Sequence, residues 1–113
     1  MPTHLTYIIQ FVANMDQAVM FYRDRLGLPL KFQSPEWSEF GTGATTLALH
    51  SASSVNPAGK LGLGFSVPDL QTFYEEMSST GVKFTQPPKP EGGVAVARFL
   101  DAEGNECSVS QER

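Results

Sequence analysis

The feature that most constrains this chain is an internal duplication, because two segments of about 50 residues repeat one order of predicted elements. Each segment opens with an apolar or alternating run typical of a strand, at residues 5–12 and 61–67. Apolar residues at helical spacing follow, over residues 15–26 in the first half and from residue 70 in the second. The duplication therefore predicts two copies of one strand and helix unit.

Start and stop signals for both helices are present. Asn14 stands at the expected beginning of the first helix, with Gln17 three residues later, which is the spacing of a capping box. Asp69 is the corresponding cap of the second helix. Gly27 and Gly81 end the two helices, because glycine readily adopts the left-handed conformation that follows a helix.

Three short strands are expected after each helix, so that each half reads β-α-β-β-β and the fold class is α+β. The predicted ranges are 30–33, 37–41 and 45–50 in the first half, and 82–85, 94–100 and 106–110 in the second. Residues 87–93, with three prolines and two glycines, are expected to be irregular, as a connecting loop or as a lid over a ligand.

Turn-forming residues join the two halves. The stretch 51–60 is rich in serine, asparagine, proline and glycine and is interpreted as a linker. It separates a first module of about residues 5–50 from a second of about residues 61–111. Neither is long enough to bury a sufficient core alone, so one domain over residues 1–113 is predicted.

Composition excludes several classes of protein. A net charge of -4 argues against binding to nucleic acid or to an anionic membrane. No apolar run approaches the roughly 20 residues that span a bilayer, and we expect a cytoplasmic location. The single cysteine, Cys107, excludes an internal disulfide and a thiolate metal cluster, and it is interpreted as a small buried hydrophobic residue.

Three motifs resemble a known family over nearly the whole chain. They are Phe-Tyr-Arg-Asp-Arg-Leu-Gly at residues 21–27, Val-Pro-Asp-Leu at residues 67–70 and Asp-Ala-Glu-Gly-Asn at residues 101–105. The sequence resembles the vicinal oxygen chelate superfamily, which includes glyoxalase I, bleomycin-resistance proteins, fosfomycin-resistance enzymes and extradiol dioxygenases. The last motif departs from the usual form at Ala102, where a proline is common.

The resemblance implies a curved mixed sheet in which the two modules enclose a cup, with the helices on its convex side, and a homodimer. Strand alternation then assigns alternate residues to the cup. A cup with mostly apolar walls and few polar anchors is typical of a small-molecule site. The expected ligand-binding residues are Tyr7, Phe11, Trp37, Glu39, His50, Glu106 and Ser108.

The resemblance also implies where a divalent metal would be held, and the residues there are not metal ligands. Members that bind a metal use His, Gln or Glu at four strand positions, which correspond here to Tyr7, Ala48, Gly62 and Ser108. None of these is a usual ligand of such ions. A register slip of two residues would offer only His50 and Glu106. We therefore expect no metal or other cofactor, with a site built on that pair as the alternative.

Three functions follow from these residues. The first is a metal-independent small-molecule-binding protein that holds an apolar or aromatic ligand in the cup. The alternative is an enzyme, a metal-dependent lyase, isomerase or dioxygenase of the glyoxalase type with an atypical site. A non-catalytic interaction module whose edge strands dimerise is the third. No catalytic residue is assigned.

Overall fold

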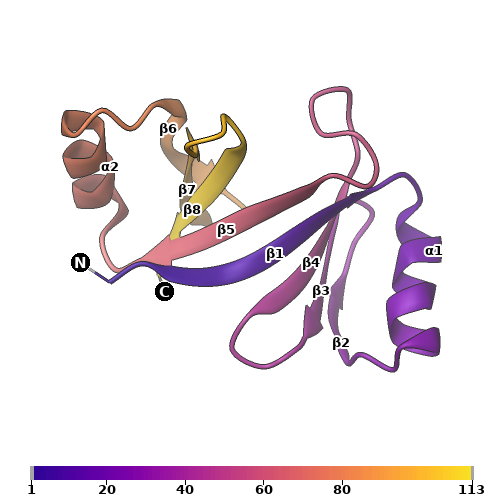
Figure 1. Cartoon of the computed structure of the whole chain (residues 1–113). Coiled ribbons are helices and arrows are strands. Elements are labelled where there is room, and N and C mark those ends of the chain that lie inside the picture. Colours follow the sequence, from indigo (N-terminus) through magenta and orange to yellow (C-terminus); the bar gives the residue numbers. More distant parts are fainter. Residues whose placement is uncertain (1, 113) are drawn as a thin grey trace. The chain divides into compact units, whose positions relative to one another are not determined.

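The protein divides into two compact units, each of which repeats the predicted order of elements. In a computed structural model, which describes residues 2–112, these residues form eight strands, two α-helices and one π-helical segment (Figure 1). Residues 7–61 make one unit, here called the first module, and residues 2–6 with 62–112 make the other, the second module. That both belong to one domain stays a prediction, and Met1 and Arg113 lie outside the described residues.

The first module has a mixed arrangement of four strands. Its strand order is β2-β3-β4-β1, in which β4 pairs parallel with β1 and antiparallel with β3. The elements are β1 (His4–Val12), α1 (Met15–Met20), the π-helical segment η1 (Phe21–Arg25), β2 (Leu30–Gln33), β3 (Trp37–Gly41) and β4 (Thr46–Ser51).

The second module repeats this plan, with strand order β5-β8-β7-β6 and a parallel β5–β8 pair. The α+β class and the two tandem βαβββ modules are therefore confirmed. The elements are β5 (Leu61–Val67), α2 (Leu70–Ser79), β6 (Phe84–Glu91), β7 (Val94–Leu100) and β8 (Glu106–Gln111).

Both predicted helix caps form. The side-chain oxygen of Asn14 accepts a hydrogen bond from the backbone N–H of Gln17 at 3.0 Å. Asp69 accepts one from the backbone N–H of Thr72 at 3.2 Å, and this bond lowers the pKa of Asp69. Each cap satisfies a backbone donor that has no partner within the helix. The first helix ends in the wider π-helical turn of η1, and Gly27 follows at φ 74°.

One face of each four-stranded unit is covered by its helix. In the first module, Val19 of α1 packs against Phe40 of β3 and Leu49 of β4, all at most 1% exposed. In the second, α2 contacts β6, β7 and β8. The buried residues of that core are Val67, Leu70, Ala97 and Val109.

The lone cysteine behaves as a small hydrophobic residue, as predicted. Cys107 lies on β8 and is 4% exposed. Burial raises the pKa of its thiol, which keeps it protonated near neutral pH.

The prediction for residues 87–93 is wrong, because most of that stretch belongs to a strand. β6 continues through Pro87, Pro88 and Pro90 to Glu91 and pairs antiparallel with β7. β6 is the last strand in the order of its module, and an edge strand tolerates proline because half its backbone donors need no ladder partner. Register shifts on either side of Gln86 accommodate the prolines. Only Gly92 and Gly93 remain as the turn, so this stretch belongs to a paired hairpin and not to an irregular loop.

The turn between β7 and β8 is organised by one carboxylate. Asp101 accepts hydrogen bonds from the backbone N–H groups of Glu103 and Asn105, both at 2.9 Å. These bonds lower the pKa of Asp101. Gly104 takes the left-handed conformation at φ 84°, which the tight turn requires. No helix within residues 2–112 is long and apolar enough to cross a membrane.

We predict that the first core depends strongly on Phe40. Its side chain is 0% exposed, so Phe40→Ala leaves a cavity and should lower the free energy of unfolding by about 3–5 kcal/mol. Phe32→Ala is the matched control, because Phe32 is 54% exposed and its loss should cost less than about 1 kcal/mol. Urea unfolding of both variants measures the difference, and equal losses would contradict this assignment of the core.

Candidate functional site

The face of the first module away from α1 carries most of the predicted site residues. Phe11 of β1, His50 of β4 and Trp37 of β3 stand in one row, because Phe11 pairs with His50 and His50 pairs with Trp37. Glu39 and Tyr7 lie on the same face, two and four residues from Trp37 and Phe11 along their strands. The structure therefore brings five of the seven predicted residues together on one surface.

Aromatic rings contact one another across this face. The rings of Phe11 and His50 lie 5.2 Å apart between centroids, and those of Trp37 and His50 lie 5.9 Å apart at 86°. Tyr7 meets Trp37 edge-on, at 5.5 Å and 77°. Edge-to-face geometry is the favourable arrangement for such pairs. The rings thus form a connected group, which we call the aromatic face.

Ile9, Ala48 and Glu39 occupy the row between the rings. Tyr7 and Trp37 belong to different rows of the register, so their rings meet diagonally across the row that contains Ile9 and Ala48. Ile9 is 8% exposed and Ala48 is 0% exposed. The small side chain of Ala48 leaves room for rings above it, at one of the positions where the family resemblance would place a metal ligand.

One hydrogen bond fixes the tautomer of His50. Its Nδ1 lies 2.8 Å from the backbone oxygen of Ser51. Because a carbonyl oxygen only accepts, Nδ1 carries the hydrogen and donates it. The other ring nitrogen, Nε2, has no hydrogen-bond partner among the described residues. In neutral His50 it is therefore an acceptor on the aromatic face.

Glu39 is held by its strand neighbour. The indole Nε1–H of Trp37 donates to Oε2 of Glu39 at 2.7 Å. Both residues are partly buried. The bond orients the carboxylate and the indole ring together on the aromatic face.

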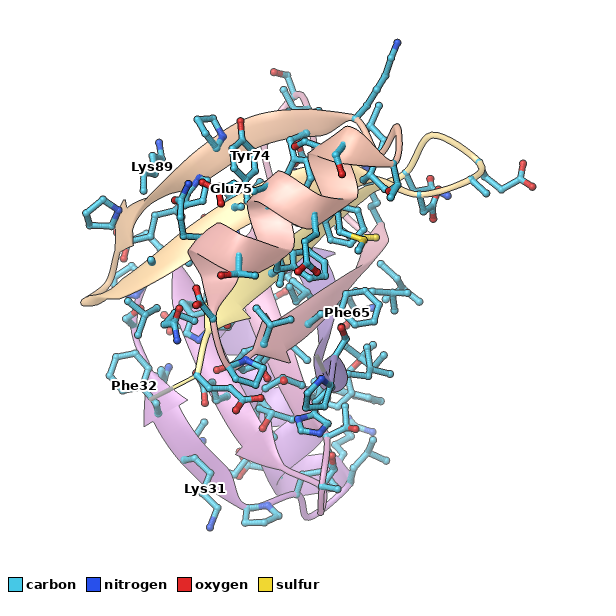
Figure 2. All side chains as sticks on the ribbon, turned by 90° about the vertical axis from the view of Figure 1, so that its left-hand side faces the viewer. Lys31, Phe32, Phe65, Tyr74, Glu75 and Lys89 are labelled. Atoms are coloured by element: carbon cyan, nitrogen blue, oxygen red, sulfur yellow. The ribbon has the colours of Figure 1, made fainter. Side chains whose placement is uncertain are left out.

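A bulge in β2 adds a residue that sequence reasoning missed. The register shifts between Leu30, which pairs with Phe40, and Phe32, which pairs with Glu39. Directly paired residues share a face, so Phe32 lies beside Glu39 although Leu30 packs into the core. Phe32 is 54% exposed, and Figure 2 shows that it projects from β2 in a different direction from Lys31. The sequence gives no signal for this register shift, because the prediction assumed that side chains alternate strictly between the two faces of a strand.

The other two predicted residues, Glu106 and Ser108, belong to the second module. Glu106 accepts a hydrogen bond from the Thr85 hydroxyl at 2.7 Å. Ser108 of β8 pairs with Gly64 of β5 and with Arg98 of β7. Their part in ligand binding stays a prediction.

Arg98 is a further polar residue that sequence reasoning did not single out, although it is the one charged residue in the apolar strand β7. Its guanidinium donates to both carboxylate oxygens of Glu91, at 2.7 Å and 2.9 Å, and to Gln86 at 2.6 Å. These bonds raise the pKa of Arg98 and lower that of Glu91. Because the pair is bidentate and about two-thirds buried, it stabilises the β6–β7 hairpin.

The usual metal-ligating side chains do not cluster in the part of the chain that the structure describes. No group of three or more His, Cys, Asp or Glu residues that could hold an ion occurs among residues 2–112. On the aromatic face the usual donors are His50 and Glu39, and Glu39 already accepts the indole hydrogen bond. In the second module Glu106 and Glu91 are engaged with Thr85 and Arg98. This donor set does not fit the site of His, Gln and Glu ligands that the family resemblance implies.

An open hollow of about 430 Å³ lies near the beginning of α1. None of the predicted site residues lines it. The Gln33 amide donates to Asp16 across it at 3.3 Å. Its lining residues are Asn14, Met15, Asp16, Gln33, Ser34 and Pro35.

We predict that Glu91 stabilises the second module in a pH-dependent way. Its lowered pKa means that the ion pair stabilises the fold fully above the unfolded pKa, about 4.5, and that this contribution is lost as the pH falls from there through the lowered pKa of the folded state. Glu91→Gln should lower the free energy of unfolding by about 1–2 kcal/mol near neutral pH and by less near pH 3. Urea unfolding at both pH values measures this. The exposed Glu36→Gln is the control, and an equal, pH-independent effect of both variants would contradict the prediction.

Comparison with known proteins places these observations in a family. The chain is 30% identical to the uncharacterised protein YurT of Bacillus subtilis (strain 168), over 90% of this chain and 94% of YurT. It superposes on methylmalonyl-CoA epimerase from Mycobacterium tuberculosis with a TM-score of 0.82 at 18% identity, covering 97% of this chain and 88% of the epimerase. That likeness shows the fold alone.

A second solved structure is the 2,3-dioxygenase LapB from Pseudomonas sp. KL28, with a TM-score of 0.71 at 15% identity. The superposition covers 96% of this chain and 42% of LapB. The family model of the Glyoxalase/Bleomycin resistance protein/Dioxygenase superfamily matches residues 4–109. The resemblance inferred from the sequence motifs is thus confirmed: the chain belongs to the Glyoxalase/Bleomycin resistance protein/Dioxygenase superfamily.

Proposed function

We propose that this protein binds a small, flat, apolar or aromatic molecule on the aromatic face of the first module, without a metal ion. The observation that carries this proposal is the connected group of rings on the face opposite α1. A ligand pressed against rings is removed from water over a large apolar area at little conformational cost. Phe32, 54% exposed, offers apolar surface that the fold itself does not bury.

The polar atoms of this face suit orientation of a bound molecule. Nε2 of neutral His50 accepts hydrogen bonds, and the carboxylate of Glu39 has an oxygen beyond the one bonded to Trp37. Mostly apolar walls with a few polar groups are the usual composition of a small-molecule site. The alternative, metal-dependent lyase or dioxygenase chemistry, has no comparable support, because the donor set does not fit.

We predict that acridine, a neutral three-ring compound, binds saturably and quenches the emission of Trp37, the single tryptophan. Phe32→Ala should weaken this binding about tenfold, because about 1.4 kcal/mol of contact with the exposed ring is lost. Phe21→Ala is the matched control, since Phe21 is 47% exposed but lies on η1. Isothermal titration calorimetry gives the three affinities.

Two results would contradict the proposal. One is the absence of saturable acridine binding to the folded protein. The other is stoichiometric binding of nickel, zinc, manganese or iron that His50→Ala or Glu106→Ala abolishes, which would favour the metal-dependent enzyme. Thermal shifts with and without chelator measure the second.

We also propose that the protein acts as a homodimer, as the family resemblance implies, and that it acts in the cytoplasm. Light scattering of the purified protein should then give twice the mass of one chain at micromolar concentration. A single-chain mass across the whole concentration range would overturn the homodimer.

A further inference from the structure

The carboxylate of Glu39 has an unusual set of neighbours. An ionised carboxylate offers about four acceptor sites, and the structure fills one of them, with the indole Nε1–H of Trp37. Among residues 2–112, no lysine, arginine or histidine lies within 4 Å of it as an ion-pair partner. A partly buried carboxylate in aromatic surroundings therefore retains most of its capacity to bind a positive group.

The second module provides an internal comparison. The register pairs Glu39 with Ala48 and Phe32, and at the equivalent strand positions it pairs Arg98 with Ser108 and Gln86. Arg98 is neutralised within its module, because Gln86 and Glu91 from β6 bind it.

Glu39 receives no such partner from β2. Its neighbour there is Phe32, whose side chain has no hydrogen-bond donor. The charge of Glu39 is therefore not neutralised from β2. The two equivalent positions thus differ in one respect: one charge is satisfied by the fold, and the other is available to a ligand.

The aromatic rings beside Glu39 also favour binding of a positively charged group. The face of an aromatic ring attracts a cation, and tryptophan does so most strongly. Donation of the indole hydrogen to a carboxylate polarises the ring further in that direction. Phe32, paired with Glu39 across the strands, and Trp37, two residues along β3, therefore offer two such rings beside one carboxylate, which is chemistry that recognises an organic cation.

Lys31 is the cation of the chain nearest to this position along β2. Its side chain lies against Gly41, where an added Cβ would come within 2.7 Å of the lysine Cε. Figure 2 shows Lys31 and Phe32 pointing in different directions. Lys31 thus lies near the aromatic face without neutralising Glu39.

We propose that the ligand of the aromatic face is a flat organic cation, whose charge is bound by Glu39 and whose body stacks on Phe32 and Trp37. This proposal rests on the proposed function and adds the sign of the ligand's charge. A carboxylate or phosphate group on the ligand would instead be repelled by Glu39.

Three matched probes test the proposal by calorimetry: N-methylacridinium, which is permanently positive, acridine, which is neutral, and anthracene-9-carboxylate, which is negative. The cation should bind about tenfold more tightly than acridine, and the anion most weakly. Glu39→Gln should weaken the binding of N-methylacridinium about tenfold more than it weakens the binding of acridine, so that the preference for the cation is lost. Glu36→Gln is the charge-matched control and should retain the preference.

A further variant examines the role of Lys31. Lys31→Gln removes a neighbouring positive charge, so it should strengthen binding of N-methylacridinium and leave acridine unchanged. Circular dichroism of each variant confirms that it is folded before titration.

The outcomes separate the two proposals. Equal affinities for the three probes, or a cation preference that persists in Glu39→Gln, would overturn the cationic ligand and leave the aromatic binding face intact. Failure of all three probes to bind the folded wild-type protein would overturn both. A preference for the cation that Glu39→Gln alone removes supports both.

Discussion

The parallel pairing of β1 with β4 is the constraint on which the first module depends. It places Phe11 opposite His50 and Ile9 opposite Ala48, while Leu49, one residue along, turns to the helix side. Sliding this pairing by one residue would expose the core and bury the polar atoms of the aromatic face. The free energy that holds Leu49 and Phe40 under α1 therefore also fixes the rings of Trp37 and His50 on the opposite side.

Most strands and both helices were predictable from the spacing of apolar residues, because an element that buries one face must repeat apolar residues on that face. The ranges of β2, β3, β5 and β7 match the predicted strands, and Asn14 and Asp69 cap the helices as their side-chain chemistry requires. What periodicity misses is local irregularity. The bulge that turns Phe32 toward Glu39 depends on strand pairing, and the prolines of β6 are tolerated because the strand lies at an edge.

The polar network of the second module was missed for a different reason. Arg98 interrupts an apolar strand, but the partners that justify it, Gln86 and Glu91, lie 12 and 7 residues away in sequence and come together only through the hairpin. Sequence alone also read part of that hairpin as irregular because of its prolines. The prolines of β6 therefore prevented the prediction both of the strand and of the ion pair that its Glu91 makes with Arg98.

Duplication explains why the two modules share a plan and differ in chemistry. Equivalent positions hold Ala48 and Ser108, neither a usual metal ligand, and beside them stand Glu39 and Arg98. Arg98 is bonded within its own hairpin, so its charge mainly stabilises the fold. Glu39 receives only an indole hydrogen bond, and a partly buried charge with so few partners contributes little to stability. Its place among exposed and half-buried rings therefore supports the proposal that its charge serves a ligand and not the stability of the fold.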